Sequence, residues 1–387
     1  MVTKAVVTAD CHVHPWRVCS RDGGRDRLMD ALSVLRQSLD LAARHRAAWI
    51  TLGDFKQPKT SWPQEALTGA HAALRAHAGL PMVFLEGNHD RKGEGGSGLA
   101  PFRDVAIVMD ELDVLSTGDK FAGGLRWDGP NLVCAPWDAD PAEVRRTVEG
   151  SRFPLLGHAF LRGASLGPES DVIGKGVPVE DFGPFPVALF GDVHKGQVRR
   201  PRKNRPPEWF PFVAVVTDEE ATIDPPWVVG RKGFCGEVYY PGSPYQQNWG
   251  ERNDGPKGAL LVDFEEQTVE LHPLESPRFI RLEVDDDGVE RLLAAREGAA
   301  GQFLTVVYTG GNARTAAAAL GPVAEEARVF QFVTAPKAEA GSVRADINAG
   351  MGRGEMLARY MDARPPAEGV DRVRALEAGR RLAGCGE

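Results

Sequence analysis

The sequence lacks the paired cysteines and long apolar runs that are typical of secreted, zinc-binding or membrane-spanning proteins. Its five cysteines are scattered through 387 residues and include no Cys-x-x-Cys pair. This favours reduced thiols over a disulfide framework or a thiolate-rich zinc site. No apolar run approaches the roughly 18 residues that a membrane-spanning helix needs, and residues 4–9 already form a strand pattern where a signal peptide would lie. We therefore expect a cytoplasmic protein with no membrane partner.

An excess of positive charge is also missing. The formal net charge is -8, which argues against a protein that coats nucleic acid over its whole surface and leaves room for a local basic track. With 42% hydrophobic and 26% charged residues, the composition is that of an ordinary globular protein. The length allows one large domain and one smaller domain.

What the sequence does have is polar residues placed directly after short apolar strands. The run from Met82 to Leu85 is typical of a buried parallel strand, and Gly-Asn-His-Asp follows at residues 87–90. In open α/β sheets, ligands bind beyond the carboxyl ends of the strands. These side chains are therefore candidates for a functional site, although Asn-His-Asp taken alone also forms an ordinary turn.

The same arrangement occurs twice nearer the amino terminus. Strand patterns at residues 4–9 and 49–52 lead into Asp-Cys-His and Gly-Asp. Apolar residues at helical spacing follow each strand, over residues 25–48 and 63–78. This β-α-β-α-β order, with right-handed crossovers, predicts a parallel sheet whose strand ends lie side by side.

Asp10 and His12 belong to the first of these strand ends and Asp54 to the second. Side chains two residues apart on an extended backbone point to the same side, so Asp10 and His12 would grip one metal ion. A solvated loop is the alternative interpretation. Asp54 and Asn88 are expected at the same edge of the sheet.

Two more strand patterns end in the same way. Residues 153–156 lead into Gly-His, and residues 187–190 lead into Gly-Asp-Val-His. Five strand ends that carry imidazole, carboxylate and amide groups favour binuclear metal catalysis, in which two ions about 3.5–4 Å apart clamp the oxygens of a phosphoester. This ligand mixture suits Mn²⁺, Fe or Zn²⁺ better than Ca²⁺.

These motifs, in this order, resemble the calcineurin-like metallophosphoesterases. The resemblance implies an α/β sandwich of two mixed sheets flanked by helices, with a small α/β capping domain. The resemblance covers residues 4–265. Within the family, it is most specific to the SbcD-type DNA repair nucleases of bacteria and phages. The motifs that narrow it are Gly-His-Ala at 157–159 with Gly-Ala at 163–164, Gly-Asp-Val-His-Lys-Gly-Gln at 191–197, and Tyr-Pro-Gly-Ser-Pro at 240–244 with Gly-Glu at 250–251.

The resemblance also implies two divalent metal ions, with Mn²⁺ favoured and Mg²⁺, Fe or Zn²⁺ as the other candidates. The implied ligands are Asp10, His12 and His194 for the first ion, Asp54 as the bridge, and Asn88 and His158 for the second ion. His89 would contact the scissile phosphate or protonate the leaving oxygen.

Two positions depart from the family pattern. Where the family has Gly-His-x-His, this chain has Asp192, whose carboxylate would bind the second ion and favour a harder ion such as Mn²⁺. Where related nucleases carry His or Asp three residues after the bridging aspartate, this chain has Gln57. A proton-relay partner for His89 is therefore expected to be missing.

A basic segment follows the last ligand motif. Its five cations are Arg199, Arg200, Arg202, Lys203 and Arg205. Prolines at 201, 206 and 207 argue against a helix, so we expect a loop beside the metals that contacts the phosphate backbone of DNA. A solvated basic loop is the alternative.

The chain is expected to have three parts. Residues 1–274 would form the nuclease domain. Alternating strand and helix patterns over residues 275–336 predict a small α/β unit, similar to the DNA-binding capping domain of the family. Residues 337–387 resemble a linker and a helical tail, which in the family docks on an SbcC-type, SMC-like ATPase. A tail helix that packs on its own domain is the alternative.

These features together predict a Mn-dependent DNA exonuclease or endonuclease that hydrolyses phosphodiester bonds by a two-metal mechanism. The resemblance implies a homodimer that acts with the ATPase in DNA repair, recombination or phage DNA processing, in a bacterial or phage-infected host cytoplasm. Two alternatives stay open. One is a phosphoesterase of the same fold that acts on small phosphodiesters or phosphoproteins. The other is a DNA-end-binding subunit whose chemistry is weakened at Asp192 and Gln57.

Overall fold

The computed structural model divides the chain into two compact units, Met1–Val333 and Thr334–Glu387. The tail predicted over residues 337–387 lies outside the described residues. The residues that the structure describes are 2–16, 25–57, 61–91, 96–121, 124–166, 173–202, 205–212, 227–228, 233–252 and 256–335.

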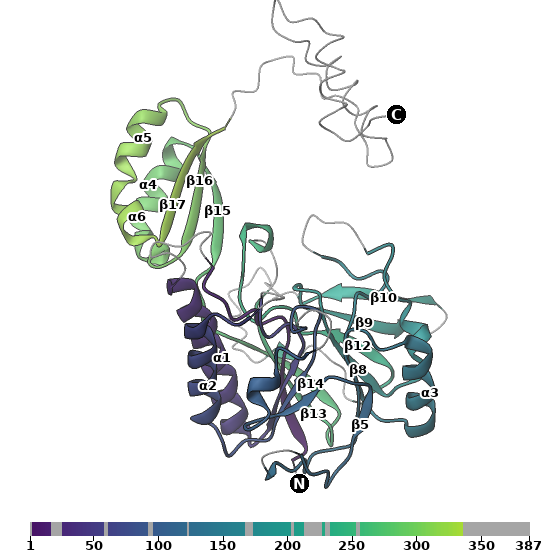
Figure 1. Cartoon of the computed structure of the whole chain (residues 1–387). Helices are drawn as coiled ribbons and strands as arrows, with labels where there is room; N and C mark the ends of the chain where they lie inside the picture. The colour runs from purple at the N-terminus through teal and green to yellow at the C-terminus, as the bar shows by residue number, and fades with distance from the viewer. Residues whose placement is uncertain are drawn as a thin grey trace, which may run out of the picture. The chain divides into compact units, whose positions relative to one another are not determined.

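Two mixed sheets form the body of the first unit (Figure 1). The first sheet contains β1 (Lys4–Thr8), β2 (Ala48–Leu52), β3 (Met82–Leu85), β4 (Ile107–Met109), β11 (Trp227–Val228), β13 (Gly258–Asp263) and β14 (Thr268–Pro273), in the order β11-β14-β13-β1-β2-β3-β4. The second contains β5 (Asp113–Leu115), β6 (Leu132–Ala135), β7 (Leu155–His158), β8 (Val187–Gly191), β9 (Gln197–Arg202), β10 (Arg205–Pro211) and β12 (Glu237–Tyr240), in the order β10-β9-β12-β8-β7-β6-β5. The predicted fold class, an α/β sandwich of two mixed sheets, is confirmed.

Alternation along the strands explains the layers. Val7 and Ile50 point into the apolar core between the two sheets, whereas Val6 and Trp49 point to the opposite face of the first sheet. The helices α1 (Arg25–His45) and α2 (Gln64–Arg75) cover that face and lie side by side (Figure 1). On the second sheet, α3 (Pro141–Ser151) and a short 3₁₀ helix (Val179–Phe182) cover the outer face. Two further 3₁₀ turns span Ala100–Phe102 and Trp249–Glu251.

A third sheet has its own apolar core. It contains three strands in the order β15-β16-β17, of which β15 and β16 pair in parallel. Its helices are short. The elements are β15 (Phe279–Val284), α4 (Asp286–Ala294), a 3₁₀ turn (Arg296–Ala299), β16 (Phe303–Tyr308), α5 (Ala313–Ala319), α6 (Gly321–Glu326) and β17 (Val329–Thr334). These elements lie within residues 275–336, and the division of residues 1–336 into a nuclease domain and a capping domain stays a prediction.

A buried arginine joins the third sheet to α1. The guanidinium of Arg27 is fully buried and lies 4.9 Å from the centroid of the Phe303 ring. It also donates to Asp30 (2.9 Å) and to the carbonyl oxygen of Gln246 (2.9 Å). Arg328, the residue before β17, reaches the same Asp30 carboxylate at 2.5 Å. A buried charge needs this degree of pairing, so the cluster is a specific attachment of the third sheet.

The basic segment is not a loop, which corrects the expectation from its prolines. Its described residues, 199–202 and 205, lie on β9 and β10, which pair antiparallel, with Arg199 opposite Trp209. Proline is tolerated on β10 because this strand is at the edge of the second sheet, where a missing N–H costs no ladder hydrogen bond.

No helix in the described part of the chain is long and apolar enough to cross a membrane.

Candidate metal centre

The strand ends of the two sheets meet closely, and glycines make this approach possible. A Cβ atom on Gly191 would lie 1.9 Å from the carbonyl oxygen of Leu52. At Gly53, which has a φ of +82°, a Cβ atom would lie 2.2 Å from Nδ1 of His158. Any larger residue would push the sheets apart. The Gly-Asp motifs at 53–54 and 191–192 therefore bring the polar strand ends into one site.

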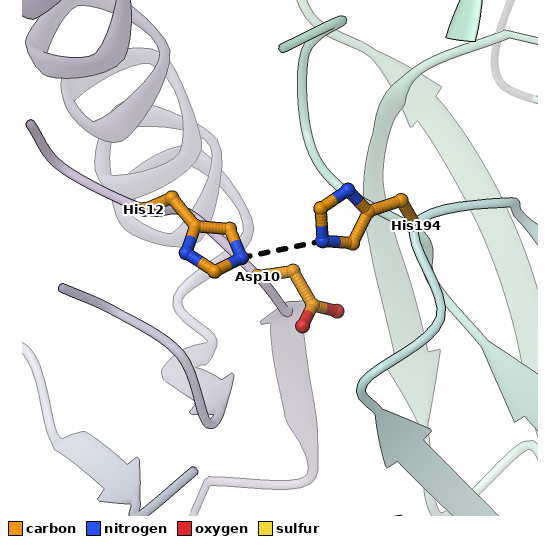
Figure 2. Close-up of side chains that lie close together, drawn as sticks. All are labelled: Asp10, His12 and His194. Atoms are coloured by element: carbon orange, nitrogen blue, oxygen red, sulfur yellow. Dashed lines mark hydrogen bonds between the residues drawn. The ribbon is translucent and has the colours of Figure 1, made fainter. Parts of the chain in front are cut away.

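The first group of side chains contains Asp10, His12 and His194, which come from the ends of β1 and β8 (Figure 2). Their ligand-type atoms all lie within 4.8 Å of one another. The Nε2 atoms of the two imidazoles face each other at 3.2 Å. Asp10 is fully buried, and its carboxylate accepts from the backbone N–H of Asp192 at 3.1 Å. These three residues can hold one cation, although His194 comes more than 180 positions after the other two.

Asp54 lies at the centre of the site. Its Oδ2 atom is 3.9 Å from Nε2 of His12 and 3.9 Å from Nε2 of His89, while its Oδ1 atom is 3.5 Å from Nε2 of His158. The backbone N–H of His89 donates to Oδ1 at 2.8 Å. Because its two oxygens face different imidazoles, Asp54 has the geometry of a bridging carboxylate.

The remaining predicted ligands surround the far side of Asp54. Asp192 Oδ1 is 3.7 Å from Nε2 of His158. Three buried ligand-type atoms, Asn88 Oδ1, His158 Nε2 and Asp192 Oδ2, have no hydrogen-bond partner among the described residues. Buried polar atoms are almost always paired, so a second cation among these atoms fits the residues present.

Two histidines are held with a ring nitrogen available for a metal. Nδ1 of His158 donates to the carbonyl oxygen of Leu52 at 2.7 Å, which directs Nε2 toward Asp54. Nδ1 of His194 lies 3.0 Å from Oε1 of Glu251, which directs its Nε2 toward His12. A metal-binding imidazole typically has its other nitrogen fixed in this way.

The backbone of the ligand segments is left-handed rather than extended, which corrects the reasoning that placed Asp10 and His12 on one side of a strand. The φ angles are 52° at Asp10, 43° at His12, 51° at Asp54 and 91° at Asp192. β1 ends at Thr8, so both residues belong to the irregular segment beyond it. Residues held at positive φ cluster at functional sites, where the surrounding structure supports the strain.

The electrostatics of the site are those of clustered buried carboxylates. Burial raises the pKa of Asp10 to about 7 and also raises the pKa of Asp192. Burial by itself would lower the pKa of His158, but the carboxylates of Asp54, Asp10 and Asp192 outweigh it and raise that pKa to about 10. At His12, burial and the neighbouring His194 lower the pKa to about 3, which keeps this ring neutral. Divalent cations would compensate the clustered carboxylates and let them all ionise.

His89 has a partner that the sequence did not reveal. Its Nδ1 atom lies 2.5 Å from the backbone carbonyl oxygen of Gln57. The side chain expected at this position in related nucleases is absent, but the main chain of the same residue orients the ring instead. Because a carbonyl oxygen only accepts, Nδ1 carries a proton and Nε2 is the atom that faces the site.

Asp90, the last residue of Gly-Asn-His-Asp, is structural. Its buried carboxylate accepts backbone N–H groups of Gly87 (3.0 Å), Lys56 (3.0 Å) and Phe55 (3.3 Å). It therefore ties the turn after β3 to the turn after β2, and so sets Asn88 and Asp54 relative to each other.

Glu251 is a site residue to which the sequence patterns assigned no role. Besides His194, its carboxylate contacts Nζ of Lys257 at 2.9 Å and the hydroxyl of Ser243 at 3.0 Å. Burial alone would raise the pKa of Glu251, but Lys257 and His194 outweigh it and hold that pKa well below its usual range. Gln247 completes this support by donating to the carbonyl oxygen of Asp10 at 2.7 Å. The only sequence signal was the Gly-Glu motif at 250–251.

We expect Glu251→Gln to weaken the binding of the first metal ion. The variant keeps the size of the side chain but loses the charge that strengthens the Nδ1–H bond of His194, and such changes typically cost about 10–100-fold in metal affinity. Titration of the metal-free protein with Mn²⁺ measures this. Glu237→Gln, at another buried glutamate on β12, is the control and should bind Mn²⁺ like the wild type. Equal affinity in both variants would show that Glu251 does not position His194.

The basic residues differ in how much the structure reveals of them. Arg199 on β9 is paired with the Glu180 carboxylate. The guanidinium of Arg200 lies 5.8 Å from the centroid of the Phe210 ring. The side chains of Arg202 and Arg205 and the whole of Lys203 lie outside the described residues. The predicted DNA-binding role of these five cations stays a prediction.

The site has the composition of a binuclear metallophosphoesterase centre, and the comparison with protein families agrees. Residues 3–158 match the calcineurin-like phosphoesterase family. This span includes the predicted ligands from Asp10 to His158, whereas Asp192 and His194 lie beyond it. Over this span the chain is therefore similar to the calcineurin-like phosphoesterases.

Two further comparisons were made. Among solved structures, the chain is similar to the Pseudomonas putida nuclease MPE, with 20% sequence identity and a TM-score of 0.26. The alignment covers 47% of this chain and 76% of that chain. Among curated proteins, none matches the sequence.

Proposed function

We propose that this protein is a metal-dependent nuclease that hydrolyses phosphodiester bonds in DNA. The observation that carries the proposal is the position of Asp54, whose two oxygens face three imidazoles at 3.5–3.9 Å. Asp10, His12 and His194 would hold one ion, and Asn88, His158 and Asp192 the other. Two divalent ions there would supply Lewis-acid activation and a clamp on the attacking and leaving oxygens. The oxygen-rich second position, with Asn88 and Asp192, favours Mn²⁺ or Mg²⁺ over softer ions.

His89 is the proposed acid. Its Nδ1–H bond to the Gln57 carbonyl fixes the ring, and Nε2 lies 3.9 Å from Oδ2 of Asp54, at the centre of the site. When the ring is protonated, the Nε2–H group would donate to the phosphate oxygen or to the leaving oxygen. No carboxylate relay is needed for this role.

The third sheet is the proposed capping domain for DNA. It is joined to the metal centre by a short series of hydrogen bonds. Gln246 accepts from the backbone N–H of Phe279 on β15 at 2.6 Å and donates to the carbonyl oxygen of Glu251 at 3.0 Å. Glu251 in turn contacts His194 at 3.0 Å. A ligand that displaces the third sheet would therefore act directly on the support of His194.

The partners and location belong to the same proposal. The resemblance to SbcD-type nucleases supports a homodimer that acts in DNA repair or recombination with an SbcC-type ATPase, docked through residues 337–387. A cytoplasmic location is supported by Cys11, Cys134 and Cys235, which are free thiols. Mixing the protein with such an ATPase and measuring the complex by light scattering, with and without residues 337–387, tests the docking.

The nuclease proposal is tested by incubating the Mn²⁺- or Mg²⁺-loaded protein with duplex DNA, single-stranded DNA, a small phosphodiester and a phosphopeptide. We expect hydrolysis of DNA that a chelator abolishes. Turnover of the small diester or the phosphopeptide without DNA cleavage would replace the proposal with a phosphoesterase of the same fold. Binding of DNA ends without any hydrolysis would indicate a catalytically weakened DNA-end-binding subunit.

Neutralising the five cations of the basic segment, from Arg199 to Arg205, is expected to weaken binding to all DNA sequences alike. Phosphate contacts carry no base information, and each one that is lost flattens the dependence of log K on log[salt] by about 0.9. The affinity for duplex DNA, measured at several salt concentrations, tests this.

A matched control removes five exposed arginines near the helices of the first sheet: Arg36, Arg44, Arg46, Arg75 and Arg103. Because the net charge changes equally, a nonspecific charge effect would appear in both variants. If the dependence of log K on log[salt] is unchanged in the β9–β10 variant, the DNA backbone is bound by another surface.

A further inference from the structure

A pocket of about 280 Å³ lies beside the proposed second metal position. Its lining includes Trp137, His158, Ala159, Phe182 and Phe190. His158 also belongs to the metal centre, where its Nε2 atom is 3.5 Å from Asp54. The pocket therefore shares His158 with the candidate active site, yet the two-metal chemistry gives it no role.

The strand register places Trp137 next to the metal centre. β6 and β7 are parallel and pair Ala135 with Gly157, so the segments that follow them leave the sheet side by side. The backbone N–H of Trp137 donates to the carbonyl oxygen of Glu86 at 3.1 Å, two residues before Asn88. Trp137 thus adjoins the two strand ends that carry Asn88 and His158, the proposed ligands of the second ion.

The pocket suits a flat, uncharged group. Phe182 and Phe190 are buried, and they line it together with the indole of Trp137, which is 45% exposed. The charges at its rim are carboxylates: Asp138, which pairs with Arg91 at 2.6 Å, and Asp140, which caps α3. Acidic groups at the rim disfavour a phosphate inside the pocket, whereas aromatic walls favour stacking.

We propose that this pocket binds the nucleobase next to the scissile phosphate, with the indole of Trp137 as its stacking platform. The inference rests on the proposed function, because the phosphate would sit at the metals while the sugar spans the distance to Trp137. A pocket that accepts one base by stacking tolerates every base, since each has a π-face. It also requires that base to leave the duplex stack, so it favours single-stranded or frayed DNA ends.

The test compares the binding of two probes to the Mn²⁺-loaded protein by titration calorimetry. The probes are dAMP and 2-deoxyribose 5-phosphate, which share the phosphate and the sugar and differ only in the base. Stacking of one base on an aromatic side chain corresponds to about 5- to 150-fold in affinity, and we expect the wild type to prefer dAMP by a factor in this range. Trp137→Ala should lose most of this preference without changing the affinity for 2-deoxyribose 5-phosphate.

Phe160→Ala is the matched control, because Phe160 is also 45% exposed and is not among the residues that line the pocket. It should keep the full preference, and so should Trp137→Phe, which retains a ring. If Trp137→Ala does not fold, Trp137→Leu replaces it with the same expected result. Equal binding of both probes to the wild type, or a preference that survives the loss of the indole, would overturn the inference. The titration needs no hydrolysis, so a protein that binds dAMP through Trp137 and leaves DNA intact would contradict only the proposed nuclease function.

Discussion

Replacing Asp54 by Asn is expected to remove both metal ions from the protein and to reduce DNA hydrolysis to background. Asparagine keeps the shape of the side chain and an oxygen that can accept from the backbone N–H of His89, which is 2.8 Å away in the wild type. It loses the charge and the second oxygen, and a bridging ligand needs both. The three imidazoles around Asp54 would then lose the carboxylate that all three approach within 3.9 Å.

Metal analysis after reconstitution with Mn²⁺ measures this effect as a change from two ions per chain to none. Asp263→Asn is the control, because Asp263 is also buried and lies opposite Lys4, at the other end of β1 from Asp10. That variant should keep two ions and full activity. One ion or none in the wild type would contradict the two-metal site, and two ions in Asp54→Asn would show that Asp54 does not bridge.

Replacing His89 by Ala is expected to reduce DNA hydrolysis by about 10²–10⁴-fold, the usual contribution of a positioned general acid. The metal content and the DNA affinity should stay close to the wild type. The reason is geometric: Asn88 offers an unpaired buried oxygen, whereas His89 is held at Nδ1 by the Gln57 carbonyl, and its Nε2 lies 3.9 Å from Oδ2 of Asp54. Single-turnover rates with saturating Mn²⁺ separate this chemical effect from binding.

The metal content of the His89 variant decides between two roles for this ring. His12, Asp54 and His89 lie close enough together to hold an ion themselves. Loss of an ion with His89→Ala would therefore make His89 a ligand, and full activity would make it a turn residue only. His77→Ala removes an imidazole that pairs with Asp40, on α1, and should leave both metal content and rate unchanged.

The sequence by itself determined the β-α-β-α-β beginning of the chain and the residue types at the strand ends, whereas the sandwich of two mixed sheets was what the resemblance to the metallophosphoesterases implied. These features depend on local patterns, because hydrophobic periodicity and glycine placement are readable within windows of about ten residues. The rule that ligands gather at the carboxyl ends of parallel strands then brought Asp10, Asp54 and Asn88 together. His158 and His194 likewise come at the carboxyl ends of strands, in this case β7 and β8 of the second sheet.

Only the tertiary structure decided how these residues are held and what lies beside them. The support of His194 by Glu251 joins residues 57 positions apart, and the carbonyl of Gln57 is a main-chain group that no side-chain motif encodes. The positive φ angles at Asp10 and His12 and the close approach of the two sheets at Gly53 and Gly191 involve segments far apart in the chain. Whether proline-rich residues 199–211 form a loop or an edge strand likewise depended on a partner strand. Hydrophobic periodicity predicts which face of an element is buried. Strand register and long-range hydrogen bonds instead depend on which elements come into contact, and only the folded structure determines those contacts.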